Sequence, residues 1–137
     1  MEKSINNKLK IGFSIGDFNG IGPEILLKAF CNKNLFEVCV PIVFSSRYIL
    51  DYYKDKFSID IDINDQKNNI KENQINCFSN EKFDSNILPG QVNMDAGRYA
   101  ESSLRESIKY FKKGFIDSLI TLPISKINIQ SKTFQFP

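Results

Sequence analysis

A glycine-rich segment between two regular patterns constrains the fold of this chain more than any other feature. Residues 16–24 read Gly-Asp-Phe-Asn-Gly-Ile-Gly-Pro-Glu. Apolar residues alternate with polar or small ones over 9–15, which is typical of a strand, and recur at helical spacing over 25–30. Pro23 suits the first turn of a helix, where its missing N–H loses no hydrogen bond. The segment therefore predicts a strand that turns sharply into a helix, the building unit of α/β proteins.

Two interpretations of this segment remain open. Glycines at 16, 20 and 22 permit positive φ and a close approach of the backbone to a bound group, and the N–H groups at a helix start suit an anion. Glycine-rich turns are also ordinary connections between a strand and a helix. The spacing matches neither the G-x-G-x-x-G dinucleotide fingerprint nor the Gly-Lys-Ser/Thr of a P-loop. The segment is therefore either a tight connection or a ligand loop of another kind.

The composition argues against several classes of function. The 137 residues are 42% hydrophobic, which is enough for one domain with a core. The 18 Lys and Arg are scattered among 16 Asp and Glu without a basic stripe, so we expect no nucleic-acid partner. No apolar run approaches the roughly 18 residues of a membrane span, and residues 1–8 lack the apolar stretch of a signal peptide. We therefore expect a cytoplasmic protein with no membrane partner.

The chain contains no histidine, which excludes Ser-His-Asp or Cys-His catalysis and any histidine metal site within this polypeptide. Cys31, Cys39 and Cys77 show no C-x-x-C spacing, so we expect buried free thiols. A site built on this chain alone would use Asp, Glu, Lys, Ser or Tyr.

The middle of the chain continues the alternation of strands and helices. Residues 38–44 form an apolar run typical of a strand covered on both faces, although Pro41 favours a sheet edge or the start of the strand. Ser45 and Ser46 offer an N-cap for a short helix over 47–53. Beyond it, alternating isoleucines predict a half-exposed strand over 59–63. The Asn- and Lys-rich stretch 65–73 predicts a solvated loop without a site.

The second half opens with a long helix pattern. Asn93 is placed to cap it, and Gly114 is placed to end it. One apolar stripe of this helix predicts a face buried in the core, and it comprises Gly97, Ala100, Leu104, Ile108 and Phe111. Residues 115–122 then predict a buried strand that Pro123 ends. Helices and strands in this order predict a mainly parallel sheet.

Lys126 follows this last strand, at the edge of a parallel sheet where ligands collect. Its ammonium group could bind a phosphate or carboxylate, or act as an acid or base if burial lowered its pKa. It is equally consistent with a surface lysine.

Three segments together resemble a known family. Residues 12–24, the Met-Asp-Ala-Gly-Arg of 94–98, and the Leu-Ile-Thr-Leu-Pro-Ile-Ser-Lys of 119–126 are similar, in order and spacing, to the N-terminal signatures of 4-hydroxythreonine-4-phosphate dehydrogenases. The resemblance implies a three-layer α/β/α fold like that of isocitrate and isopropylmalate dehydrogenases, truncated here. Residues 1–137 would be the N-terminal part of a two-domain dehydrogenase whose C-terminal part is absent.

By this resemblance, the complete enzyme oxidises 4-phosphohydroxy-L-threonine with NAD or NADP and decarboxylates it to 3-amino-2-oxopropyl phosphate, on the route to pyridoxal phosphate. A divalent metal, Zn, Mg or Co, would polarise the substrate oxygens. The complete enzyme would be a homodimer. Its metal-binding histidines and cofactor residues come later in the family's chains, so we expect no metal or cofactor residue here, no bound cofactor, and no turnover by this chain alone.

The resemblance also implies four substrate-binding residues, namely Asp17, Asn19, Gly20 and Lys126. Asp17 is equally consistent with a cap for the helix at Pro23 or with a bond to its own loop, because Asx side chains do this routinely. The sequence departs from the family's usual pattern at Phe18, Asn19, Asp95 and Ser125. An alternative function is a stand-alone α/β module that binds a phosphorylated metabolite at the glycine loop, without metal or catalysis.

Overall fold

The structure is a computed structural model, and it describes residues 8–79, 82–129 and 135. Its elements are β1 (Leu9–Ser14), α1 (Gly22–Phe30), α2 (Leu35–Val38), β2 (Cys39–Phe44), α3 (Arg47–Lys56), β3 (Ile63–Asn64), β4 (Ile75–Phe78), α4 (Met94–Lys112) and β5 (Ser118–Thr121). The strands form one sheet in the order β3-β4-β2-β1-β5, and every neighbouring pair is parallel.

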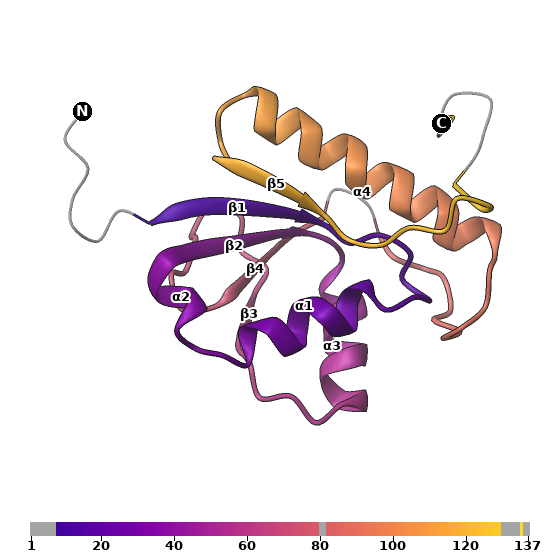
Figure 1. The fold of residues 1–137 in the computed structure, drawn as a ribbon, viewed down its shortest axis with the longest axis horizontal. Coiled ribbons are helices and arrows are strands. Elements are labelled where there is room, and N and C mark those ends of the chain that lie inside the picture. Colours follow the sequence, from indigo (N-terminus) through magenta and orange to yellow (C-terminus); the bar gives the residue numbers. More distant parts are fainter. Residues whose placement is uncertain (1–7, 80–81, 130–134, 136–137) are drawn as a thin grey trace.

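The helices lie on both faces of this sheet (Figure 1), with α4 on one face and α1 and α3 on the other. A large apolar core joins α1 and α3 to the sheet and includes Leu27, Ile49 and Val43. A smaller core on the α4 side is built around Ile42, Phe44, Phe78 and Ile116, among others. The predicted three-layer α/β/α fold with a parallel sheet is therefore confirmed.

The strand β2 corrects the prediction made from Pro41. All six of its residues are buried, as predicted for a strand covered on both faces. It is, however, the central strand of the sheet, and it begins at Cys39. The β2–β4 ladder starts at Ile42, one residue after Pro41, and the Pro41 carbonyl accepts a hydrogen bond from Asn76 Nδ2 at 3.2 Å. Proline is tolerated here because that ladder begins only after it.

Four predicted helix boundaries are confirmed. The Ser46 side chain accepts a hydrogen bond from Tyr48 N at the start of α3. Asn93 Oδ1 accepts from Ala96 N at 2.9 Å at the start of α4. Gly114 follows the end of α4 with a φ of 77°, the left-handed conformation that glycine adopts without strain. Pro23 lies in the first turn of α1, as predicted.

The predicted core face of α4 is wrong in its second half. Ile108 and Phe111 are 37% and 46% exposed, although Gly97 and Ala100 are buried. The face that packs on the sheet is made of small residues, namely Ala96, Gly97, Ala100, Ser103 and Ser107. Small side chains allow the helix backbone to lie close to the sheet, which turns the larger apolar residues outward.

The predicted burial of the last strand is also wrong. Within the described residues, β5 pairs only with β1, and Ile120 is 43% exposed. An apolar strand at the edge of a sheet keeps one side of its backbone unpaired. The apolar pattern therefore identified the strand correctly but not its surroundings.

Two further predictions are corrected in part. Residues Ile59, Ile61 and Ile63 are buried alternately as predicted, but only Ile63–Asn64 is a hydrogen-bonded strand. Cys39 and Cys77 are buried free thiols, whereas Cys31 is exposed. Burial raises the pKa of the Cys77 thiol to about 12. The elements α2 and β4 had not been predicted at all.

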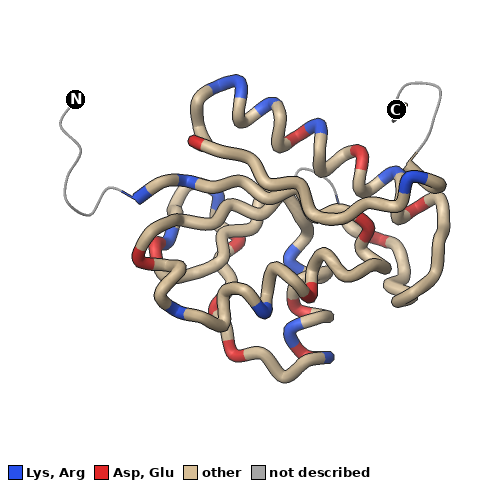
Figure 2. Tube along the Cα trace, in the orientation of Figure 1, with Lys and Arg blue, Asp and Glu red and all other residues tan. Residues whose placement is uncertain are grey.

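Charged residues of both signs are interspersed along the chain (Figure 2). The predicted solvated loop at 65–73 is mostly exposed and contains no helix or strand. None of the helices in the described part of the chain is both long and apolar enough to cross a membrane.

Candidate functional site

The glycine-rich loop between β1 and α1 packs against the segment that follows β5. Gly16 has a φ of 73°, and a Cβ added to it would lie less than 3.0 Å from the Pro123 carbonyl oxygen. A Cβ added to Gly22 would lie 2.9 Å from the Ile15 carbonyl oxygen. These two glycines are therefore required because neighbouring backbone occupies the space of a side chain. Neither Gly20 nor Gly22 has a positive φ, contrary to what the sequence suggested.

Gly20 differs from its two neighbours in the loop. A Cβ there would make only ordinary contacts, 3.4 Å from the Asp17 carbonyl oxygen and 3.6 Å from the Asp17 Cβ. Its N–H donates to the Asp17 carbonyl oxygen at 2.9 Å, which closes a tight turn. The absence of a side chain at Gly20 is therefore not explained by packing within the described chain.

Asp17 connects the loop to two other parts of the structure. Its carboxylate is 6% exposed; Oδ1 accepts from the Asn19 N–H at 2.8 Å, and Oδ2 accepts from Asn128 Nδ2 at 3.1 Å. Asn128 Nδ2 also donates to the carbonyl oxygen of Asn93, the cap of α4, at 3.0 Å. The interpretation that Asp17 bonds its own loop is confirmed. The alternative that it caps the helix at Pro23 is wrong, because the N-cap of α1 is Ile21 and no side chain caps that helix. The same carboxylate also holds the turn after β5 against the loop.

Asn19 is buried, with 3% of its surface exposed, and it is only partly bonded. Its Oδ1 accepts from Leu88 N at 2.7 Å, but Nδ2 has no partner among the described residues. Asn128 Oδ1 is also buried without a partner in that part of the chain. Since buried polar atoms are normally hydrogen-bonded, these two atoms mark places for a water molecule or a polar group of a ligand. Both belong to residues that bond Asp17.

Lys126 lies in the turn after β5, two residues before Asn128, and it is exposed. The turn is closed by a bond from Ile129 N to the Ser125 carbonyl oxygen at 3.3 Å. Asp17, Asn19 and Gly20 share the loop, and the Asp17–Asn128 bond joins this loop to the turn that carries Lys126. The structure thus brings together two segments more than 100 residues apart.

The loop rests on an aromatic base. The Phe18 ring is fully buried and meets Phe83 and Tyr99 edge to face, with ring centroids 5.1 Å and 5.8 Å apart. The Tyr53 hydroxyl donates to the Phe18 carbonyl oxygen at 2.5 Å. Burial raises the pKa of Tyr53 to about 12, and nearby Tyr52, Asp17 and Glu24 add to this. The phenol therefore stays protonated and keeps donating at neutral pH.

The residues present do not by themselves fit a metal ion or a dinucleotide. Across residues 8–79, 82–129 and 135, no group of three or more His, Cys, Asp or Glu is placed to hold a metal. Both oxygens of Asp17 already accept hydrogen bonds. The spaces at Gly16 and Gly22 are filled by the chain's own backbone, so this loop offers no cradle for a pyrophosphate.

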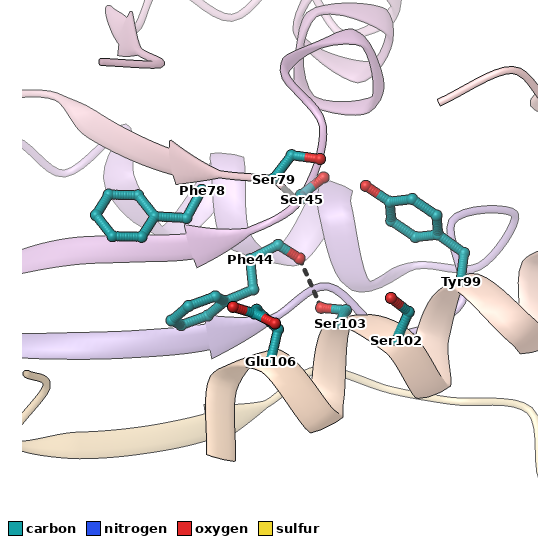
Figure 3. A pocket seen from close by; sticks show the side chains of 8 residues that line it. All are labelled: Phe44, Ser45, Phe78, Ser79, Tyr99, Ser102, Ser103 and Glu106. Atoms are coloured by element: carbon teal, nitrogen blue, oxygen red, sulfur yellow. Dashed lines mark hydrogen bonds between the residues drawn. The ribbon is translucent and has the colours of Figure 1, made fainter. Parts of the chain in front are cut away.

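A second feature of this sheet edge escaped the sequence analysis. A cavity of about 230 Å³ lies between α4 and the carboxyl ends of β2 and β4. Its lining comprises Phe44, Ser45, Phe78, Ser79, Tyr99, Ser102, Ser103 and Glu106 (Figure 3). The sequence does hold one signal for this cavity, because Ser45 directly follows β2 and Ser79 directly follows β4. The sequence pattern alone indicates only a helix cap at Ser45. Asn128 carried no local signal, because its role depends on a contact with residue 17.

Comparisons with known proteins identify relatives of this chain. The family of the pyridoxal phosphate biosynthetic protein PdxA matches residues 37–137. The 4-hydroxythreonine-4-phosphate dehydrogenase of Bacteroides thetaiotaomicron is 29% identical over 136 residues, 96% of this chain and 36% of the relative. A candidate D-threonate 4-phosphate dehydrogenase of Clostridium botulinum is 29% identical over 132 residues, which are 92% of this chain and 39% of the relative.

Solved structures show the same fold. The 4-hydroxythreonine-4-phosphate dehydrogenase of Burkholderia phymatum superposes with a TM-score of 0.81 at 21% identity, over 89% of this chain and 38% of that one. The terephthalate 1,2-cis-dihydrodiol dehydrogenase of Burkholderia xenovorans superposes with a TM-score of 0.73 at 20% identity. This chain therefore spans little more than a third of the length of the proteins it matches.

The fold is thus that of a parallel α/β protein whose curated relatives are named as dehydrogenases. The chain belongs to the PdxA family.

Proposed function

We propose that this chain supplies the N-terminal part of a two-domain, NAD- or NADP-dependent dehydrogenase. The substrate is 4-phosphohydroxy-L-threonine, which the complete enzyme oxidises and decarboxylates to 3-amino-2-oxopropyl phosphate for the synthesis of pyridoxal phosphate. The family match supports a dehydrogenase of this kind. The second group of relatives supports a phosphorylated four-carbon hydroxy acid as the wider substrate class.

The observation that carries the proposal is the bonded junction between the glycine loop and the turn after β5. Both segments follow parallel strands at their carboxyl ends, where open α/β sheets bind ligands. A hydrogen bond joins Asn128 to Asp17, and within the described part of the chain Asn19 Nδ2 and Asn128 Oδ1 are buried without partners. A site of this kind can orient a polar substrate with little loss of conformational entropy on binding.

Each proposed substrate-binding residue has a distinct task. Lys126 contributes a positive charge at the exposed surface for the phosphate or carboxylate of the substrate. Asn19 Nδ2 donates a hydrogen bond from a fixed position, and Gly20 leaves room for the substrate to approach the backbone. Asp17 is a positioning residue, because both of its oxygens are engaged with the chain itself.

The hydride acceptor and the divalent metal would be held by residues outside those described here. When bound, the metal would polarise the oxygens of the substrate. We propose that the complete protein is a cytoplasmic homodimer, as the family resemblance implies. The task of this chain is to bind and orient the substrate, and it is inactive by itself.

A chimera tests this function. Residues 1–137 would replace the matching part of the Bacteroides thetaiotaomicron relative, and NADH formation would be followed with 4-phosphohydroxy-L-threonine and Zn or Mg. We expect turnover by the chimera and none by the 137-residue chain. Turnover by the chain alone would contradict the proposal. So would a folded chimera that binds NAD but leaves this substrate unchanged.

A stand-alone binding module is the second candidate function. The cavities at the carboxyl ends of β2 and β4 favour it, since they could bind a metabolite without metal or cofactor. If the chimera turns over 4-phosphohydroxy-L-threonine, a stand-alone binding module is excluded as the main function of this chain.

A further inference from the structure

Two adjoining cavities lie at the carboxyl ends of β2 and β4. The first, of about 230 Å³, lies against α4, and the second, of about 480 Å³, lies beside the start of α3. They share Ser45 and Ser79 in their walls, and we call the two adjoining cavities together the trough. The trough shares neither Asp17, Asn19, Gly20 nor Lys126 with the glycine-loop site.

The first cavity is lined mainly by hydroxyl groups and one carboxylate. Ser45 is buried, and in Figure 3 the hydroxyls of Ser45, Ser79 and Tyr99 point toward the same space. Ser102 and Glu106 line it from α4. Among the described residues no Lys or Arg lines this cavity, and its one carboxylate, Glu106, is paired with Lys109 outside the cavity, at 3.6 Å from Lys109 Nζ. An anionic group would therefore meet no cation in the cavity wall. The hydroxyl groups of a ligand suit this cavity better than an anionic group, because they can donate hydrogen bonds to the carboxylate and to the serine oxygens.

The structure itself fixes the position of these α4 residues. Ser103 Oγ accepts from the Ile15 N–H at 2.9 Å and donates to the Phe44 carbonyl oxygen at 2.6 Å, as the dashed line in Figure 3 marks. The Tyr99 hydroxyl accepts from Ser46 N at 2.7 Å. The helix is therefore bonded to β1, β2 and the start of α3, and the cavity wall is rigid.

The second cavity has the opposite charge. Arg47, Lys67 and Lys82 line it, and among the residues that the structure describes Asp65 is the one acidic residue in its wall. Arg47 is paired with two carboxylates, since its Nη1 lies 3.7 Å from Asp65 Oδ1 and its Nε lies 3.3 Å from Asp51 Oδ2. Lys67 and Lys82 add two further positive charges to the wall. Three cationic side chains around a polar space suit a phosphate group.

We propose that this trough is a second ligand site and that it binds a small phosphorylated polyol. The phosphate lies among Arg47, Lys67 and Lys82, and the hydroxyl groups lie against Ser102 and Glu106. The two ends differ in charge, so neither inorganic phosphate nor a neutral polyol can use both. The site is independent of the proposed dehydrogenase function, because it needs neither metal nor cofactor.

A titration of the 137-residue chain, followed by the ¹⁵N–¹H spectrum of its amides, tests the proposal. The probes are glycerol 3-phosphate, inorganic phosphate and glycerol. We expect saturable shifts at Ser46, Arg47 and Ser102 with glycerol 3-phosphate, and at least tenfold weaker binding of the other two probes. Lys82→Met should weaken the binding of glycerol 3-phosphate at least fivefold. Glu106→Gln should weaken the binding of glycerol 3-phosphate at least threefold and leave the affinity for inorganic phosphate unchanged.

The control is Lys112→Met, which removes one positive charge from the far end of α4, outside the trough. Equal weakening by this control would show a nonspecific charge effect and overturn the proposal. Equal affinity for inorganic phosphate and glycerol 3-phosphate would overturn it as well. So would a spectrum without saturable shifts at the three named amides.

Discussion

Gly97 tests most sharply how the turn after β5 is held in place. This residue lies on the buried face of α4, and a Cβ added to it would lie less than 3.0 Å from the carbonyl oxygen of Asn128. The clash is with backbone, so a side-chain rotation cannot relieve it. In Gly97→Ala the turn must move away from α4, and the bond from Asn128 to Asp17 breaks with it.

The expected loss of stability follows from three effects. Overpacking a tight contact costs about 1–3 kcal/mol. Losing a hydrogen bond to a carboxylate adds about 1.5–3 kcal/mol. Alanine in place of glycine within a helix offsets about 1 kcal/mol of this. We therefore expect Gly97→Ala to lower the free energy of unfolding by about 3 kcal/mol.

Urea unfolding followed by circular dichroism measures this change, with Gly20→Ala as the matched control. A Cβ at Gly20 makes only ordinary contacts at 3.4 Å and beyond, so the control should change stability by less than about 1 kcal/mol. If Gly97→Ala and the control unfold at the same urea concentration, α4 and the turn are not packed as described.

Three further substitutions test the same framework. Ser103→Ala should destabilise the chain by about 2 kcal/mol in urea unfolding, because the buried Ile15 N–H loses its acceptor, whereas exchange of the neighbouring Ser102 should have little effect. Asn128→Ala should cost about 1–3 kcal/mol by the same measurement, and an unchanged midpoint would show that the bond to Asp17 contributes nothing. The raised pKa of Tyr53 stabilises the fold below pH 10, and this contribution should be lost as the pH rises toward 12. Unfolding at pH 9 and pH 11.5 should therefore show a steeper loss for the natural chain than for Tyr53→Phe, and parallel losses would refute the assignment.

The sequence predicted those parts of the fold that local chemistry decides. The strand before Gly16 and the helix after Pro23 follow from periodicity and from the φ preference of proline. The caps at Ser46 and Asn93 follow from side chains that bond N–H groups two or three residues away. Each of these signals lies within a few residues of the structure that it determines.

The features that the sequence missed depend on distant contacts. Whether β5 and the side of α4 with Ile108 and Phe111 are buried depends on which other elements pack against them. A local apolar pattern carries no information about those elements. Pro41 is acceptable in a central strand because the ladder between β2 and β4 begins only after it, at Ile42, and this register depends on a segment more than 30 residues away. The site shows the same limit, since Asp17 was recognisable in its loop but its partner Asn128 was not.

The kinetics of Lys126→Met in the chimera with the Bacteroides thetaiotaomicron relative test the central claim most directly. Loss of a charge-assisted hydrogen bond of about 1.5–3 kcal/mol should raise KM for 4-phosphohydroxy-L-threonine by roughly 10- to 100-fold. Lys112→Met, on the outer surface of α4, should leave KM unchanged. If Lys126→Met and Lys112→Met give the same KM as the unmodified chimera, the turn after β5 does not bind the substrate and the proposed site is wrong.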